Sequence, residues 1–420
     1  MDVREAKEIV VQAGKKLAES GLITRTWGNV SCRISADQFV ITPSGRAYET
    51  LTPDEIVIVD IEDCSYEGDV EPSSEKGVHA EGYRLRAEIN FIIHTHQLYA
   101  SVVSPLGLDI KVTSPAAAAL LGSQVNSIPY GFPGSETLKR NVAAALSESD
   151  GKAYLMVSHG TLCLGKDCEE AFRVAAELEK ISVDIINQRY LEASGCDLID
   201  PLCLSDYIVG LHTRYKKEAV IAKPQQFGNS ERTENGFKLY LYPTEKDPFP
   251  QYNGNIIEIN LNNCAARQGL KGFPPAAIIH REIYRKHAQI NAVIQTTLFD
   301  ILTISRIGLT ICPYLDDFAQ IIGVNVQTIK KLDLDNPAIT AFEIAKKLKG
   351  RNAVLLNNNG ALCCGPTKSD TVAAVMIMEK NCKAFVAASL FGRGKPINFL
   401  ECRLMRHNYL KSYSLKVLSK

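Results

Sequence analysis

The stretch Phe91-Ile92-Ile93-His94-Thr95-His96-Gln97 places two histidines at the end of a short, apolar, β-branched run. Such a run predicts a buried strand, and on a strand residues i and i+2 face the same side. His94 and His96 should therefore point together, which is half of a metal site. The alternative is a pair of ordinary polar residues at a strand end. A third candidate ligand, His159, follows the apolar run 154–157.

The length and composition indicate an ordinary globular protein of more than one domain. The chain has 420 residues, of which 45% are hydrophobic and 22% charged, so we expect two to three domains. The formal net charge is zero, which gives no overall attraction toward nucleic acid or an anionic membrane. A charged ligand would have to be held by local groups.

The N-terminal sequence does not resemble a signal peptide. Met1-Asp2-Val3-Arg4-Glu5 carries acidic residues where a basic start and an apolar core would be needed. No later run approaches the roughly 18 apolar residues of a membrane span. The 12 cysteines are scattered, without a Cys-x-x-Cys pair, so we expect free thiols in a cytoplasmic protein without a membrane partner.

Hydrophobic periodicity in the first half predicts strands that alternate with helices. Helices are expected over 3–20, 75–87, 99–103, 116–121, 134–146 and 169–187, and strands over 26–31, 39–42, 56–60, 91–97 and 154–157. This order predicts a mixed α/β layer fold. The pattern weakens after residue 200, and Lys223-Pro224-Gln225-Gln226-Phe227-Gly228 has the composition of a connector.

The chain contains an internal repeat with a period of about 200 residues. Residues 79–96 read HAEGYRLRAEINFIIHTH, and residues 280–297 read HREIYRKHAQINAVIQTT. Farther on, the sequence 159–165 is echoed by 359–365. We infer that one scaffold was duplicated.

The second copy differs at the candidate site. His94 is replaced by Gln295, His96 by Thr297, His159 by Asn359 and Glu75 by Ala276. Neutral Gln, Thr and Asn side chains are poor zinc ligands compared with imidazole. Joint replacement within a retained pattern indicates that the three histidines act as one unit in the first copy. The alternative, independent structural roles, predicts that they would vary separately.

The first copy resembles the class II aldolase/adducin family. The resemblance rests on five ordered motifs: Gly28-Asn29-Val30-Ser31, Ile41-Thr42-Pro43-Ser44-Gly45, Ser73-Ser74-Glu75, His94-Thr95-His96 and Ser158-His159-Gly160. It implies a three-layer αβα fold in two tandem copies. We expect a catalytic domain over 1–200, a linker over 201–234, and a degenerate domain without metal ligands over 235–420.

The resemblance also implies a zinc ion on His94, His96 and His159, with Glu75 beside it. Three protein ligands leave coordination positions open, as in catalytic zinc sites. A ketose phosphate would bind through its carbonyl and hydroxyl oxygens. Zinc would then stabilise the enediolate formed by retro-aldol cleavage, and Glu75 would transfer the proton.

The family's phosphate-binding positions are small residues and turns. Backbone N–H groups near a helix start suit an anion, whereas Gly-Asn and Ser-Gly pairs taken singly are usually plain turns. The matching positions in this sequence are Thr26, Gly28, Asn29, Ser44, Gly45, Ser73 and Ser74.

One expected group is missing from the first copy. Family enzymes are generally tetramers in which a neighbour's tyrosine serves the aldehyde side, and that position here is Pro115. The matching piece of the second copy contains Tyr314, followed by Asp316 and Asp317. We hypothesise that the second copy supplies Tyr314, or one of these carboxylates, in a homo-oligomer of two tandem chains. The alternative is that Tyr314 belongs to the core.

The resemblance favours a zinc-dependent aldehyde-lyase that cleaves a ketose 1-phosphate, fuculose-1-phosphate-like or a deoxypentulose phosphate, to dihydroxyacetone phosphate and an aldehyde. A sugar-phosphate 4-epimerase typically has Asp after Ser-Ser, where this chain has Glu75. A dehydratase resembling those that act on methylthioribulose phosphate lacks a clear Ser-Ser-Glu run. A non-enzymatic scaffold such as adducin would have lost the histidines. The sequence does not fix the sugar.

Overall fold

A computed structural model of the chain describes residues 1–20, 22, 27–213, 224–241, 256–261 and 274–413. The chain forms two compact units, each described here by itself. Unit 1 comprises residues 1–193 with two short segments that begin at Leu390 and Leu410, and unit 2 comprises Ser194–Ser389 with Ile397–Tyr409. In the described residues no helix combines the length and the apolar character that crossing a membrane requires.

Unit 1 is built on an eight-stranded sheet with the order β3-β2-β1-β4-β8-β7-β6-β5. All neighbouring pairs are antiparallel except β6 and β7. The strands are β1 (Gly28–Arg33), β2 (Gln38–Ile41), β3 (Val57–Asp60), β4 (Phe91–Thr95), β5 (Ile110–Lys111), β6 (Gln124–Ile128), β7 (Ala153–Met156) and β8 (Thr161–Gly165). The candidate histidine strand β4 is therefore central, and all five of its residues are buried.

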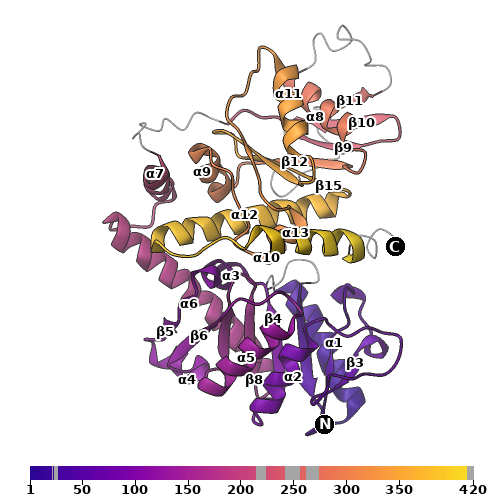
Figure 1. The fold of residues 1–420 in the computed structure, drawn as a ribbon, viewed down its shortest axis with the longest axis vertical. Coiled ribbons are helices and arrows are strands. Elements are labelled where there is room, and N and C mark those ends of the chain that lie inside the picture. The colour runs from indigo at the N-terminus through magenta and orange to yellow at the C-terminus, as the bar shows by residue number, and fades with distance from the viewer. Residues whose placement is uncertain (21, 23–26, 214–223, 242–255, 262–273, 414–420) are drawn as a thin grey trace. The chain divides into compact units, whose positions relative to one another are not determined.

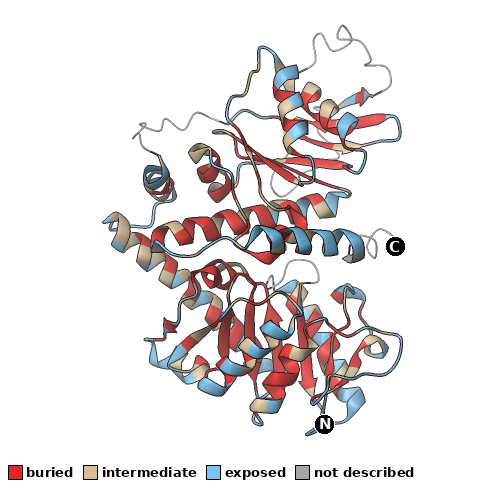
Figure 2. Cartoon of the chain, in the orientation of Figure 1, coloured by how far each residue is buried: buried red, intermediate tan, exposed pale blue. Residues whose placement is uncertain are grey.

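Helices cover the sheet of unit 1 (Figure 1). They are α1 (Val3–Glu19), α2 (Lys76–Leu85), α3 (Leu98–Val103), α4 (Pro115–Leu121), α5 (Glu136–Glu148) and α6 (Cys168–Ser194). One core cluster joins α2 and α5 to the sheet through Tyr83, Leu138, Ile92 and Phe39. The strands are coloured as buried, and the outer helix faces as exposed, in Figure 2, as amphipathic helices on a sheet require.

Unit 2 repeats the arrangement with a seven-stranded sheet, β11-β10-β9-β12-β15-β14-β13. The strands are β9 (Asn229–Arg232), β10 (Gly236–Tyr240), β11 (Ile256–Asn260), β12 (Ala292–Thr296), β13 (Thr328–Ile329), β14 (Ala353–Leu356) and β15 (Ala361–Gly365). The helices are α8 (Pro275–Lys286), α9 (Phe299–Ile307), α10 (Asp316–Ile321), α11 (Pro337–Lys347), α12 (Lys368–Phe391) and α13 (Phe399–Asn408). The strand order is that of unit 1, except that unit 2 has no described counterpart of β5. The one parallel pair, β13 with β14, corresponds to β6 with β7. Two copies of a three-layer α/β fold are confirmed.

The linker predicted over 201–234 contains regular structure at both ends, and its residues 214–223 lie outside the described residues. Residues 201–212 form helix α7 (Pro201–His212), and β9 is an internal strand of the second sheet. The Asp200 carboxylate caps α7 by accepting from the Cys203 N–H at 2.8 Å, and Pro201 occupies the first helical turn. This start signal was present in the sequence and was outweighed there by the connector-like composition of 223–228.

An arginine closes the helix beside the site in both units. The Arg33 guanidinium on β1 donates to the carbonyls of Tyr83, Arg86 and Ile89, at 3.2 Å for Arg86 and 3.0 Å for Ile89. Arg232 on β9 repeats these bonds at the end of α8. The Arg86 carbonyl also accepts from the Ile89 N–H at 3.1 Å, and the arginine adds donors at the helix end, where intrahelical donors run out. The arginine thus fixes α2, and with it Glu75, relative to the sheet.

Replacing this arginine should destabilise the fold. We expect Arg33→Met, which keeps the length but removes every donor, to lower the free energy of unfolding by about 1–3 kcal/mol, because partly buried carbonyls lose their partners. Urea denaturation followed by circular dichroism measures the change. Arg232→Met is the matched variant and should lose a similar amount. A change below about 0.5 kcal/mol, the usual range of surface substitutions, would contradict this role.

Candidate metal centre and active site

The three histidines predicted as metal ligands lie together in unit 1. His94 and His96 come from the end of β4, and His159 comes from the tight turn between β7 and β8. The three ring centroids are 4.8 Å apart in each pair, and one possible ligand atom from each residue lies within 4.8 Å of the others. All three are buried, with exposed fractions of 1%, 6% and 4%. Among the described residues they form a group able to hold a metal ion.

The turn that carries His159 depends on a close approach of backbone to backbone. Ser158 adopts a positive φ of 60°, and Gly160 faces the end of β4. A Cβ at position 160 would collide with the Thr95 carbonyl oxygen and lie 3.1 Å from the His94 ring. Only glycine allows the turn to approach β4 so closely, and this approach brings His159 to the other two imidazoles.

Glu75 lies at the N-terminal end of α2 and completes the cluster. One carboxylate oxygen is 2.8 Å from His159 Nε2 and the other 3.2 Å from His94 Nε2. Asn29 on β1 donates from Nδ2 to the second oxygen at 3.0 Å. Burial by itself would raise the pKa of Glu75, but His94 and His159 hold the pKa well below its ordinary value. The carboxylate is therefore ionised in the metal-free protein.

The donor set itself indicates a place for a cation. The Thr161 carbonyl can only accept, so His94 Nδ1 donates to it at 2.9 Å. When the imidazole is neutral, Nε2 then carries a lone pair. This lone pair faces His96 Nε2 at 3.0 Å and Glu75 Oε2 at 3.2 Å. Lone pairs crowded in this way are stabilised by a cation between them, and the carbonyl fixes the ring orientation as in known metal sites.

The predicted phosphate positions fall into two groups around this cluster. Gly28 and Asn29 lie on β1, with Asn29 directly opposite His94 in the sheet register. The turn that contains Ser44 and Gly45 is joined to the segment before Glu75, since the Ser44 N–H donates to the Glu71 carbonyl at 2.9 Å.

That segment contains the remaining two positions, Ser73 and Ser74. The Ser73 N–H donates to the Thr42 carbonyl at 3.1 Å, and its hydroxyl accepts from the Glu75 N–H at 3.3 Å. Ser74 is exposed. The last predicted position, Thr26, lies outside the described residues. The phosphate-binding role of these residues stays a prediction.

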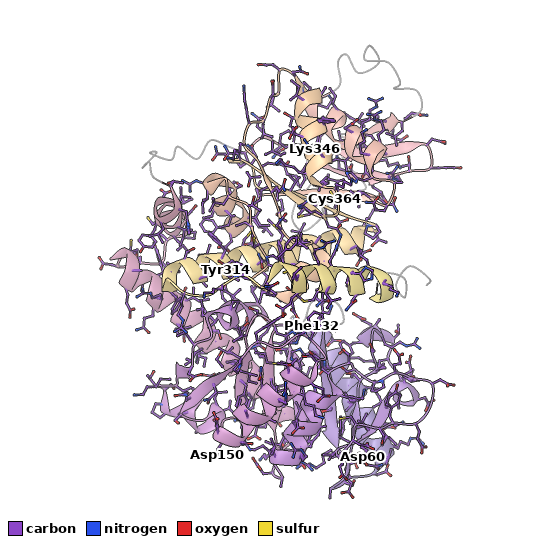
Figure 3. All side chains as sticks on the ribbon, in the orientation of Figure 1. Asp60, Phe132, Asp150, Tyr314, Lys346 and Cys364 are labelled. Atoms are coloured by element: carbon purple, nitrogen blue, oxygen red, sulfur yellow. The ribbon has the colours of Figure 1, made fainter. Side chains whose placement is uncertain are left out.

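The second-copy candidates differ in accessibility. Asp316 and Asp317 are 0% and 1% exposed, and Asp317 forms an ion pair with Lys380 on α12. Tyr314 is partly buried, its backbone N–H donates to Asn381 Oδ1 at 2.7 Å, and its ring meets that of Phe385 edge-on. Figure 3 shows Tyr314 beside α12. Of the three, Tyr314 is the one whose side chain is not enclosed by its own unit.

At the matching place in unit 2, amide side chains bind the chain's own backbone. Gln295 accepts from the Phe227 N–H and donates to the Gln225 carbonyl at 2.6 Å, and Asn359 accepts from the Gln225 N–H at 2.6 Å. A cavity of about 160 Å³ remains there, and its described lining, which includes Gln295 and Thr297, has neither imidazole nor carboxylate. The residues that replace the histidines in unit 2 thus bind the backbone of their own unit.

Sequence reasoning missed the polar side chains behind Glu75. Ser31, His79 and Tyr83 are buried beside Asn29, and the Ser31 hydroxyl is hydrogen-bonded to both His79 and Tyr83. The available signal was the repeat, because the same three residues recur as Ser230, His280 and Tyr284. Because these three residues remain in unit 2, where the metal ligands are replaced, they have a role that does not depend on metal binding.

The chain belongs to the class II aldolase and adducin N-terminal domain family. The family model matches residues 8–183 and again 239–386, as expected for a tandem duplication.

Particular relatives are aldolases. The chain is 34% identical over 180 residues to a 5-deoxy-D-ribulose 1-phosphate aldolase of Bacillus thuringiensis serovar kurstaki, which covers 43% of this chain and 83% of the relative. It is 34% identical over 175 residues, 42% of this chain and 80% of the relative, to a 5-methylthioribulose-1-phosphate/5-deoxyribulose-1-phosphate aldolase of Escherichia coli. Among solved structures, an L-fuculose 1-phosphate aldolase matches with 29% identity and a TM-score of 0.42 over 47% of this chain and 92% of that chain.

Removing one imidazole should abolish metal retention. We expect His159→Asn, which introduces the residue found at the matching position of unit 2, to lower the affinity for Zn²⁺ by at least about 100-fold, because losing a ligand costs more than losing a supporting partner. Elemental analysis after dialysis and chelator competition measure it. His212→Asn, outside the cluster, is the control and should retain the wild-type metal content. Equal metal content in the two variants would show that the ion is bound elsewhere.

Proposed function

We propose that unit 1 is a zinc-dependent class II aldolase, an aldehyde-lyase, that cleaves a 5-deoxypentulose 1-phosphate by retro-aldol chemistry. The observation that supports the reaction is the buried cluster of three imidazoles with an ionised carboxylate in contact with two of them. The names of two relatives, each 34% identical to this chain, support the substrate class.

The substrate class predicts the products. Cleavage between C3 and C4 of 5-deoxyribulose 1-phosphate gives dihydroxyacetone phosphate from carbons 1–3 and acetaldehyde from carbons 4 and 5. A methylthio group at C5 would leave with the aldehyde half. The aldehyde side therefore carries the difference between these substrates and L-fuculose 1-phosphate.

His94, His96 and His159 would hold the metal ion. Imidazole nitrogen ligands in a buried, non-thiolate site suit zinc. When bound, the ion supplies Lewis acidity that lowers the energy of negative charge on the ketose half. The protein's contribution is the fixed orientation of the rings, set for His94 by the bond from Nδ1 to the Thr161 carbonyl.

We propose that Glu75 moves the proton at C3. Loss of the C4 hydroxyl proton to a base lets the C3–C4 electron pair remain on C3 while C4 becomes the aldehyde carbonyl carbon. In the synthetic direction the ionised Glu75 carboxylate removes a proton from C3. In the cleavage direction it must first take up a proton from solvent, which it then donates to C3. Its position on the rigid N-terminal turn of α2, restrained by Asn29, suits a group that must reach one carbon.

The phosphate would be bound by the turn and helix start beside Glu75, through Ser44, Gly45, Ser73 and Ser74, with Gly28, Asn29 and Thr26 also proposed. A helix N-terminus and exposed backbone N–H groups favour an anion without a large basic patch. This agrees with a chain whose net charge is zero.

We assign unit 2, within the proposed domain 235–420, no metal of its own. Its partner role in a homo-oligomer of tandem chains is likewise a proposal, supported by the retained fold and the replaced ligands.

The proposed activity is tested with a panel of ketose phosphates. We expect release of dihydroxyacetone phosphate from 5-deoxyribulose 1-phosphate, its loss after chelation, and recovery with Zn²⁺. Glu75→Gln, nearly isosteric, should lower kcat by about 10²- to 10⁴-fold, the usual contribution of a proton-transferring group, while metal content stays at the wild-type level. The panel includes L-fuculose 1-phosphate and ribulose 5-phosphate. Epimerisation or dehydration without carbon–carbon cleavage, or no zinc-dependent turnover of any member, would reject the aldolase assignment.

Tyr314 is proposed as the acid–base group of the aldehyde side, supplied by a second copy of the chain. Its phenol is a suitable proton carrier for the C4 oxygen, although burial, followed by Cys312, raises its pKa above the ordinary value.

We expect Tyr314→Phe to lower kcat for cleavage while zinc content and the unfolding midpoint stay unchanged, because only the hydroxyl is lost. A coupled assay of dihydroxyacetone phosphate release measures the turnover. Tyr409→Phe provides a control phenol from the same unit. Wild-type turnover in Tyr314→Phe would assign this tyrosine to the core alone.

A further inference from the structure

A chain of buried hydrogen bonds leads from α2 to the Glu75 carboxylate. The Tyr83 hydroxyl and His79 Nδ1 are each 2.6 Å from Ser31 Oγ. His79 Nε2 contacts Asn29 Oδ1, and Asn29 Nδ2 is 3.0 Å from Glu75 Oε2. All five residues are buried, so these groups have each other rather than water as partners.

The direction of donation along this chain follows from what each group can do. The Asn29 Nδ2 group lies against Glu75 Oε2 and its Oδ1 lies against His79 Nε2, and an amide oxygen only accepts. His79 must then donate from Nε2. Burial, opposed by Glu75, lowers the pKa of His79 to about 4, so the ring is neutral at pH 7 and Nδ1 accepts from Ser31. Every bond therefore donates toward Glu75.

We infer that His79 is a positioning residue: its Nε2–H holds the Asn29 amide in the one orientation that aims an N–H donor at Glu75. Without this bond the amide could turn its oxygen toward the carboxylate and repel it. Glu75 would then lose the restraint that keeps it directed at the reacting carbon. The inference rests on the proposed function, in which Glu75 transfers the proton.

A comparison with unit 2 shows which of these hydrogen bonds are structural and which continue to the carboxylate. Ser230 Oγ is 2.6 Å from His280 Nδ1 and 2.8 Å from the Tyr284 hydroxyl, nearly the geometry of unit 1. These bonds tie β9 to α8, as the matching bonds tie β1 to α2. The three-residue cluster is therefore a structural connection that persists without a catalytic site.

What unit 2 lacks is the continuation to the carboxylate. Two residues before Ser230, where unit 1 has Asn29, the chain has Gly228, and Ala276 replaces Glu75. His280, equivalent to His79, has the Phe227 backbone beside it where His79 has the Asn29 side-chain amide. The amide and the carboxylate have been lost together, which is expected if the amide serves the carboxylate.

Two substitutions of His79 each retain one of its two hydrogen bonds and remove the other. The side-chain amide of His79→Asn lies near the position of Nδ1 and can still bond to Ser31, but does not reach Asn29. The longer His79→Gln places its NH₂ near the position of Nε2 and can still donate to Asn29. The matched variant His280→Asn, in the unit without a carboxylate, measures the structural cost of the first change alone.

The inference predicts that His79→Asn lowers kcat about 10- to 100-fold, as for loss of a group that orients an active residue, without a change in KM. His79→Gln should restore kcat well above the level of His79→Asn. Zinc affinity by chelator competition should match wild type in both, because the three ligands are untouched. A crystal structure of metal-free His79→Asn should show the Asn29 amide and the Glu75 carboxylate displaced from each other.

Other outcomes overturn the inference. If His79→Asn keeps the wild-type kcat, His79 is a structural residue only. The same conclusion follows if both His79 variants lose kcat equally and their unfolding midpoints fall by as much as that of His280→Asn. If His79→Asn does not fold, Asn29→Ala replaces it. A lower kcat of Asn29→Ala at unchanged KM supports a role of Asn29 in positioning Glu75. A higher KM at unchanged kcat would assign Asn29 to phosphate binding alone. If wild type cleaves no ketose phosphate, the proposed function fails, and the crystal structure alone then decides the role of His79.

Discussion

A carboxylate buried among imidazoles is the constraint that organises unit 1. An ionised carboxylate without partners in a protein interior costs several kcal/mol, so its neighbours must be fixed in place. Glu75, 8% exposed, contacts His159 and His94 and accepts from Asn29. These partners come from two strands, β1 and β4, and a turn far apart in the sequence, and the N-terminal end of α2 adds a favourable dipole. The sheet order, the glycine at position 160 and the arginine that closes α2 all serve to bring these groups together.

Unit 2 shows what the same scaffold does after this constraint is removed. Loss of the imidazoles alone would leave a buried carboxylate without partners, and Ala276 avoids that cost. The new side chains, Gln295 and Asn359, satisfy their own polar atoms by bonding to the backbone at Gln225 and Phe227. The chain thus occupies space that a ligand would need. Replacement of an ion-binding set by a satisfied amide set keeps the interior hydrogen-bonded.

Much of this organisation could be predicted from the sequence, and the exceptions have physical causes. The β4 histidines, His159 and Glu75 were found because spacing and a repeat expose them. The short strand β5 and the strands β6 and β8 were missed, since two to five residues inside a sheet carry little periodicity. The contact of His79 with Asn29, on which its proposed role rests, could not be predicted. A buried histidine in a helix pattern is indistinguishable from a core residue in the sequence, and the contact depends on the tertiary fold.

The joint replacement of the ligands and the carboxylate in unit 2 also explains why a metal site could not easily be restored there. Restoring one histidine there would place a lone imidazole beside amides that already have partners. A working site needs three ligands, the carboxylate and its amide together, and it needs the backbone at Gln225 and Phe227 displaced. Each change made alone buries an unsatisfied group, which costs about 1–3 kcal/mol. Intermediate sequences are therefore less stable than either end state. A duplicated chain that has crossed this barrier would retain the second copy for its fold, while the proposed chemistry stays with the unit in which Asn29 contacts both His79 and Glu75.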